Sequence, residues 1–391
     1  MHTQDKFAKL NVLAIAGSLL LSLTTLAPAQ SDAVRAIYAS AAIVPTNIPD
    51  IRTYAEPPKG FNPATAGDVE LATYGFPPRP DKQADPDRYS SWTQAMASAK
   101  IRWNGELKAV AGAENGSAER GTVPAISSPL PADTTPNGPQ YQSNVNAAGV
   151  ILTNKLTKWN AKSSFDQVES IMSVSKAQAP SSYGSCTYDY KEFSFAGIDS
   201  SYGNLNSTFD TLTPGLQGGV YGDVPCSGGI AGTPFYYAEF GWMYPLSRGF
   251  AVNPGDVFWA FVQASGGANG FVYLEDLTTQ AYASYSISTP GIVGHNVDWL
   301  VFTPCCTAAS DPFPLANTSA VFFDEASALT GSGGLFDAGS QASSTLILTM
   351  FDEGGGGETE YVSQGSGGYE GKYALNFHTT GCASEGGCTP K

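Results

Sequence analysis

Short apolar runs, bounded by Gly, Pro, Asn and Ser, dominate the chain after Tyr141. They include AGVILT, DQVESIMSVS, EFSFAGI, GDVFWAFVQAS, GFVYLEDL, VDWLVF and SSTLILTMF. Runs of this length and boundary chemistry are typical of β-strands. Because no helical pattern separates them, they predict an all-β domain, an antiparallel sandwich or barrel, over residues 141–380.

Two of these runs indicate how their strands are placed. VFWAFV is apolar on both faces, which predicts a central, buried strand. In VDWLVF, side chains alternate between the faces of a strand, so Asp298, Leu300 and Phe302 share one face. Trp299 lies on the other, wholly apolar face and is expected in the core.

Residues 30–111 have a different pattern from the short apolar runs seen after Tyr141, and this pattern predicts a small leader region with short helices. Asp85 is a candidate N-cap followed by Pro86 at the first helical position, and Tyr89, Trp92 and Met96 follow at spacings of three and four.

An earlier helical turn is expected through Val69 and Leu71, ending at Gly75 before a proline-rich stretch. Residues 112–140 are rich in Pro, Gly, Ser and Thr and predict a linker, and residues 381–391 form a cysteine-containing tail.

The N-terminal segment 1–29 predicts a signal peptide. Two lysines precede an apolar run that ends in Ala27-Pro28-Ala29, a small-residue cleavage pattern. A membrane anchor is the alternative, but Ser and Thr interrupt the run. We therefore expect a secreted, extracytoplasmic protein that has no membrane segment after signal cleavage, and we expect it to be a monomer.

The acidic composition of the chain limits the classes of molecule that it can bind. Charged residues make up only 14% of the chain, the net charge is −15 and the pI is near 4.5. Such a chain repels nucleic acid, so no nucleic-acid partner is expected. The acidic balance suits an acidic medium.

Six cysteines in an exported chain predict disulfide bonds, whose pairing the sequence leaves open. The candidates are Cys186, Cys226, Cys305, Cys306, Cys382 and Cys388. A zinc site is the rival interpretation, but no C-x-x-C occurs. The acidic, glycine-rich stretch 351–373 is interpreted as a solvated hairpin, with a calcium loop as the alternative. We expect no metal and no cofactor.

Serine chemistry is disfavoured, because no G-x-S-x-G occurs and His295 reads as a loop residue. The remaining chemistry is that of carboxylates and amides on strands. The chain contains, in order, the stretches SNVNAAGVILT, FDQVESIMSVS, FAGIDS, LQGGVYGDV, YYAEFGWMYP, VNPGDVFWAFV, YLEDLTTQ and VDWLVFTP. In this ordered series, from about residue 144 to about 377, it resembles the glutamic peptidase (eqolisin) family.

The resemblance implies a two-sheet antiparallel β-sandwich of concanavalin-like or jelly-roll type, and a propeptide-like role for the leader. It also implies a glutamine that stabilises the oxyanion and a glutamate that activates water. The glutamine matches Gln217, whereas the glutamate falls on Phe302. Asp298 shares the face of Phe302 but lies about 13 Å away along the strand, too far to replace a group at that position.

The family's tryptophan positions and its acidic strand also depart here. The resemblance implies that Ala147 and Phe195 stand where the family has tryptophan, and that the stretch with Glu239 is one residue longer. Glu239 is a candidate displaced carboxylate only if a bulge absorbs that residue. The expected cleft residues are Ala147, Phe195, Tyr221, Phe240, Trp242 and Asp298.

Three functions remain open from the sequence. The first is a catalytically impaired member of the fold that binds peptide or polysaccharide. The second is an active acid endopeptidase in which a displaced carboxylate works with Gln217. The third is a structural, envelope-associated protein.

Overall fold

A computed structural model describes fourteen parts of the chain. They are residues 32–109, 140–144, 147–154, 156, 158–179, 189–199, 215–242, 247–265, 269–289, 291–302, 321–338, 345–350, 362–364 and 375–377. The predicted signal peptide and most of the linker lie outside the described residues, as does the acidic glycine-rich stretch 351–373 apart from Val362–Gln364.

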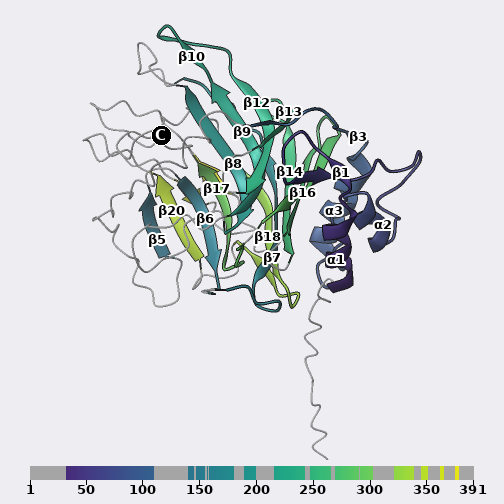
Figure 1. Cartoon of the computed structure of the whole chain (residues 1–391). Coiled ribbons are helices and arrows are strands. Elements are labelled where there is room, and N and C mark those ends of the chain that lie inside the picture. The colour runs from purple at the N-terminus through teal and green to yellow at the C-terminus, as the bar shows by residue number, and fades with distance from the viewer. Residues whose placement is uncertain are drawn as a thin grey trace, which may run out of the picture.

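Two nine-stranded sheets form a sandwich (Figure 1). The first sheet has the order β1-β2-β16-β15-β14-β7-β18-β19, and β3 also pairs with β16. Its strands are β1 (Val44–Pro45), β2 (Ile51–Thr53), β3 (Ile101–Arg102), β7 (Phe165–Ser173), β14 (Val257–Ser265), β15 (Asn269–Asp276), β16 (Ala281–Ser288), β18 (Phe323–Thr330) and β19 (Leu335–Asp337).

The second sheet has the order β4-β13-β12-β9-β8-β17-β6-β20-β5. Its strands are β4 (Lys108–Ala109), β5 (Gln140–Asn144), β6 (Ala147–Thr153), β8 (Tyr190–Ile198), β9 (Leu216–Val224), β12 (Phe235–Trp242), β13 (Ser247–Ala251), β17 (Asn296–Phe302) and β20 (Thr345–Met350). We call the face of this sheet that points away from the first sheet the outer face.

The main core lies between the two sheets. It takes alternate residues from each strand, such as Phe258, Ala260 and Val262 of β14, together with Trp299 of β17. Trp299 is 0% exposed, and its indole nitrogen donates a hydrogen bond to the carbonyl oxygen of Glu169 in the opposite sheet, at 3.0 Å. The prediction that Trp299 belongs to the core is therefore confirmed.

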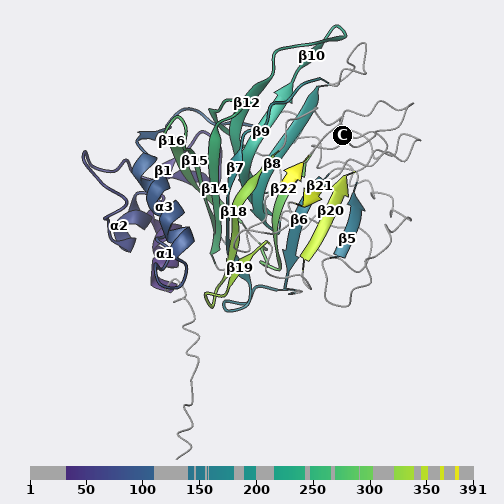
Figure 2. The same ribbon diagram turned by 180° about the vertical axis from the view of Figure 1, so that it is seen from behind.

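Three helices cover the other face of the first sheet (Figures 1 and 2). They are α1 (Asp32–Ala41), α2 (Asp68–Thr73) and α3 (Pro86–Ser98). Asp85 caps α3 by accepting a hydrogen bond from the backbone nitrogen of Arg88, as its sequence predicts. Gly75 follows α2 with φ +71°, a conformation that suits glycine at the end of a helix.

The central, buried position predicted for VFWAFV is confirmed, and the leader helices explain why both faces of this strand are apolar. β14 lies in the middle of its sheet, and its second apolar face, with Trp259 and Phe261, packs under the leader. Two apolar faces are needed because both are covered by protein.

Two small two-stranded sheets complete the described secondary structure. They are formed by β10 (Cys226–Ser227) with β11 (Ile230–Ala231), and by β21 (Val362–Gln364) with β22 (Leu375–Phe377). Cys226 takes part in a disulfide bond. The other five cysteines lie outside the described residues. Among the residues described, no helix is both long and apolar enough to cross a bilayer.

Candidate functional site

Gln217 and Asp298 lie on the same face of the second sheet, with one strand between them. Gly197 of β8 pairs with Gln217 of β9 on one side and with Asp298 of β17 on the other. Strands are about 4.8 Å apart, so the two backbones are separated by about 10 Å. Gly197 has no side chain, so the residue that pairs with both strands places no side chain between the amide and the carboxylate.

Phe302 belongs to a different row of the sheet. It pairs with Phe193, which pairs with Tyr221, four residues along β9 from Gln217. The prediction that Asp298, Leu300 and Phe302 share one face is confirmed by this register. The expectation that Asp298 is too far away is corrected, because the position opposite Gln217 is 298 and not 302.

Glu239 approaches Gln217 from the other side. β12 runs against β9 without interruption over eight pairs, in which Glu239 pairs with Gly219 and Gly241 pairs with Gln217. Glu239 is thus the diagonal neighbour of Gln217, at a typical Cα distance of about 7–8 Å.

The irregularity expected near Glu239 lies on β13. There the register shifts between the pairs Tyr237–Ala251 and Glu239–Arg248, so two residues of β13 stand opposite one of β12. The bulge leaves β12 regular and keeps Glu239 on the outer face.

The carboxyl of Glu239 is isolated from hydrogen-bond donors. Its side chain is 0% exposed, and neither oxygen has a hydrogen-bond partner. Burial raises the pKa of Glu239 well above its usual range, although the nearby cations Arg248 and Lys191 act to lower it. A carboxyl in this setting is protonated in acid and can donate a hydrogen bond.

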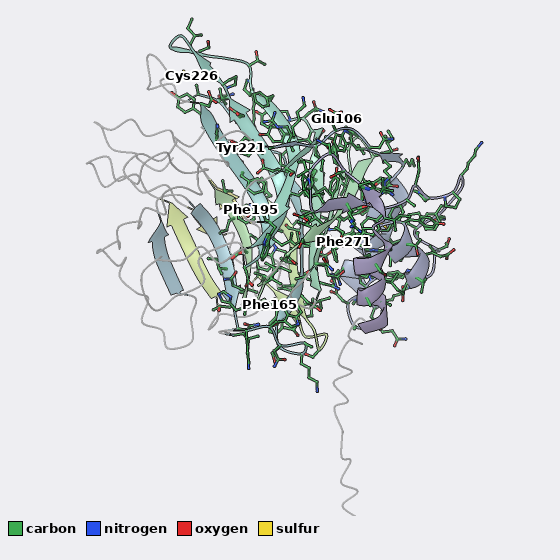
Figure 3. All side chains as sticks on the ribbon, viewed as in Figure 1. Glu106, Phe165, Phe195, Tyr221, Cys226 and Phe271 are labelled. Atoms are coloured by element: carbon green, nitrogen blue, oxygen red, sulfur yellow. The ribbon has the colours of Figure 1, made fainter. Side chains whose placement is uncertain are left out.

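Aromatic rings contact one another on the outer face, and two of them, Phe195 and Tyr221, are labelled in Figure 3. Phe193 stacks on Phe195 with centroids 4.8 Å apart, and Tyr221 stacks on Tyr237 at 5.0 Å. Phe193 and Tyr221 are 6.3 Å apart, which joins the two pairs. The hydroxyl of Tyr221 is buried without a hydrogen-bond partner. Phe195 and Tyr221, expected from the sequence to line a cleft, are thus buried members of this aromatic group.

Arg248 closes this aromatic group at the β13 edge. Its guanidinium lies 3.5 Å from the ring centroid of Tyr237 and 5.2 Å from that of Phe235. It also donates a 2.6 Å hydrogen bond to the hydroxyl of Tyr237. The positive charge is thereby held against the π-faces and near Glu239.

Two expected cleft residues lie on the opposite side of the sheet. Phe240 is 0% exposed and stacks on Tyr285 of the first sheet at 4.0 Å, and Trp242 packs against the same core. Side chains alternate between the two faces of a strand, and Glu239 and Gly241 occupy the outer face of β12, so Phe240 and Trp242 point into the core. Ala147 pairs with Phe302, so it belongs to the row of Phe302 rather than to that of Gln217.

A comparison with protein-family models identifies the family. The model described as "Peptidase A4 family" matches residues 145–360. The chain belongs to the peptidase A4 family.

Solved structures from this family are similar to the chain at low identity. A scytalido-glutamic peptidase with a transition state analog inhibitor is 22% identical, with a TM-score of 0.42, over 60% of this chain and 99% of that one. SCP-B of the eqolisin family, in a complex with the tripeptide Ala-Ile-His, is 20% identical with a TM-score of 0.40 and the same coverage.

A third structure, aspergilloglutamic peptidase from Aspergillus niger, is 21% identical with a TM-score of 0.37, over 49% of this chain and 99% of that one. A search of the curated proteins found no match.

This peptidase A4 family member anchors the start of β17 with a carboxylate that our interpretation of the sequence did not single out. Asp199 accepts backbone hydrogen bonds from residues 293–296, at 2.6–3.2 Å. Its Oδ1 also lies 3.0 Å from Nδ1 of His295. Asp199 directly follows β8 and has a φ of 54°. The sequence signal for its role is an aspartate at the end of a predicted strand, where its side chain can accept hydrogen bonds from nearby backbone N–H groups.

His295 lies in the loop before β17, as expected, and its other ring nitrogen is 3.0 Å from the side-chain amide nitrogen of Asn296. Together with Asp199 it fixes the position at which β17 begins. Asp298 is the third residue of that strand, so its placement opposite Gln217 depends on this anchor.

Within the part of the chain that the structure describes, no group of three His, Cys, Asp or Glu side chains could hold a metal ion. The chemistry available on the outer face is that of Gln217, Asp298 and Glu239. The sequence did not single out Tyr237 and Arg248 as neighbours of Glu239. Their proximity follows only from the pairing of β12 with β13.

Proposed function

We propose that the chain is an exported acid endopeptidase in which Asp298 activates water and Gln217 stabilises the oxyanion. The observation that carries this proposal is the pairing of both residues with Gly197 on one face. In this proposal, the catalytic water lies between these two side chains. The pairing favours an active enzyme over the loss of catalysis inferred from Phe302.

The chemistry follows from the positions of these groups. The Asp298 carboxylate takes a proton from the water as its oxygen attacks the peptide carbonyl. The Gln217 amide donates a hydrogen bond to the oxyanion that forms. The proton then passes from Asp298 to the leaving nitrogen as the C–N bond breaks.

Glu239 has a separate role in this scheme. Its raised pKa keeps it neutral at acidic pH, so it serves as a hydrogen-bond donor on the side of Gln217 away from Asp298. A neutral Glu239 also avoids placing a negative charge beside the Gln217 amide, where the oxyanion forms.

The decisive experiment measures cleavage of a denatured protein and of a fluorogenic peptide between pH 3 and 5. Wild type should cleave both, and Asp298→Asn should lower kcat by about 10²- to 10⁴-fold, the usual worth of a general base. Gln217→Ala should lower it by about 10²- to 10³-fold.

Matched controls separate these effects from general damage. Asp324→Asn removes an exposed carboxylate from the first sheet, and Gln83→Ala removes an exposed amide from the leader. Both should keep wild-type activity. Wild-type protein that cleaves nothing, or an Asp298→Asn variant with full activity, would contradict the proposal.

Access of the substrate belongs to the same test. Glu239 and Asp298 are both 0% exposed in the full-length chain, so the outer face must open before a peptide reaches it. We therefore expect activity to rise after incubation at pH 3, measured against a sample kept near neutral pH.

A second candidate is binding of peptide or polysaccharide without hydrolysis, which the joined rings of Phe193, Phe195, Tyr221 and Tyr237 favour. Binding of a peptide or an oligosaccharide to wild type, lost on Phe195→Ala and unaccompanied by cleavage, would select it. Phe322→Ala, which changes an exposed ring just before β18, is the control.

We propose export because segment 1–29 resembles a signal peptide. We also propose that the exported protein is a monomer. Expression with the native N-terminus should yield an extracellular protein whose first residue lies near position 30. Size-exclusion chromatography then reports the oligomeric state.

A further inference from the structure

We propose that residues 32–109 are a permanent part of the working protein, bound to the helix-covered face of the first sheet even after cleavage between residues 110 and 139. This differs from the propeptide-like role that the family resemblance implies. The packing, the charges and the strand pairing of the described leader each support it.

The surface beneath the leader is aromatic. Five rings from three adjacent strands point toward the helices, and each is at most 3% exposed. They are Trp259 and Phe261 of β14, Phe271 and Tyr273 of β15, and Tyr282 of β16. A protein without the leader would present these rings to water as one contiguous apolar patch.

The leader supplies rings that fit this surface. Tyr38 lies 4.9 Å from Phe271, and Phe76 lies 5.2 Å from Tyr282 and 6.2 Å from Tyr273. Figure 3 shows Phe271 beside the helices, on the side of the molecule away from Phe195 and Tyr221. These contacts form a second core shared between the leader and the sheet.

Charged groups are also paired across the boundary. Arg88 of α3 is buried, forms an ion pair with Glu169 of β7, and donates a 3.3 Å hydrogen bond to Gln167. Ser98 donates a 2.5 Å hydrogen bond to Glu275 of β15. Removal of the leader would leave Glu169 without its cation and Glu275 without this donor.

Backbone pairing ties the leader to both sheets. β2 pairs with β16 at three positions, β3 runs parallel to the same strand, and β4 pairs with β13 of the second sheet. A segment that extends both sheets is built into the fold rather than laid over it.

The position of the leader does not require its removal for catalysis. Its helices lie on the first sheet, whereas β9, the strand of Gln217, belongs to the second sheet (Figure 2). The leader joins the second sheet through β4, which pairs with β13 at Ser247 and Arg248. Within its described strands, it does not pair with β9 or β17, the strands of Gln217 and Asp298.

The test uses the full chain with a site-specific protease sequence inserted after Asn137. After cutting, size-exclusion chromatography at pH 4 and pH 7 should give one peak that contains both pieces, identified by mass. Separation of the pieces in native buffer, with the larger piece still folded by circular dichroism, would overturn the proposal.

A pair of leader variants tests the interface itself. Trp92→Ala removes a ring that is 2% exposed and should release the leader piece after cutting, while Val69→Ala, at a position 57% exposed, should not. The uncut Trp92→Ala protein serves as the folding control, because its circular dichroism shows whether the sandwich persists. Equal retention of both variant leaders would contradict the assigned interface.

Discussion

Gln217 of β9 and Asp298 of β17 lie directly across Gly197 from each other, on the outer face of one sheet. This relationship joins two strands that are far apart in the sequence. In our proposal, the carboxylate at position 298, and not the ring at 302, is therefore the group that activates the catalytic water.

The first prediction contrasts these two positions. Phe302→Glu should not restore activity to Asp298→Asn, because position 302 lies about 13 Å along the sheet from the row of Gln217. Initial rates at pH 4 measure this. A double variant that regains more than the single variant's activity would move the water-activating group to position 302.

The second prediction concerns the charge state of Glu239. If its raised pKa keeps it neutral, Glu239→Gln preserves both size and charge at pH 4 and should keep kcat within about threefold of wild type. Glu239→Ala should lose more, because it removes the hydrogen-bond donor. Loss of activity in Glu239→Gln equal to that in Asp298→Asn would instead make Glu239 the base.

The third prediction is that the fold loses stability as the pH rises from about 4.5 to about 8. Burial raises the pKa of Glu192 to about 7 and that of Glu275 to about 8, from an ordinary value of 4.5. Carboxyls with raised pKa values stabilise the fold fully below 4.5, and this contribution disappears as pH passes the folded values. For Glu192 the effect is about 3 kcal/mol at most.

Thermal unfolding followed from pH 4 to 9 checks this behaviour. Tm should fall between about pH 4.5 and 8. Glu192→Gln should make this fall smaller, because glutamine does not titrate. Asp324→Asn, an exposed site, should leave the profile unchanged. A Tm that rises between pH 6 and 8 would contradict the assignment.

The fourth prediction concerns the anchor of β17. Asp199→Ala removes the acceptor for four backbone N–H groups and should lower the free energy of unfolding by about 3 kcal/mol. It should also lower kcat more than it raises KM, because Asp298 loses its fixed place.

Urea unfolding and steady-state kinetics measure the two effects. Asp50→Ala is the control, since Asp50 also has a positive φ, 65°, but is exposed in the leader. Asp199→Asn, which keeps one acceptor oxygen, should fall between wild type and alanine. Unchanged kinetics in Asp199→Ala would show that Asp199 has no positioning role.

The sequence alone determined the local elements of this protein. Asp85 with Pro86 specified the start of α3, and alternation placed Asp298, Leu300 and Phe302 on one face of a strand. The apolar face of β17 likewise assigned Trp299 to the core. Each of these depends on neighbours close by in the chain, which periodicity and capping chemistry reveal directly.

Only the tertiary structure decided which rows of different strands meet. The register of β17 against β8 and β9 is set by cross-strand packing and by the Asp199 anchor, so an interpretation made along the chain could not see that position 298 faces Gln217. For the same reason the sequence did not reveal that Phe240 points into the core, because its face depends on the uninterrupted pairing of β12 with β9. The same reason also applies to the leader, whose aromatic partners lie far along the chain in β14 to β16.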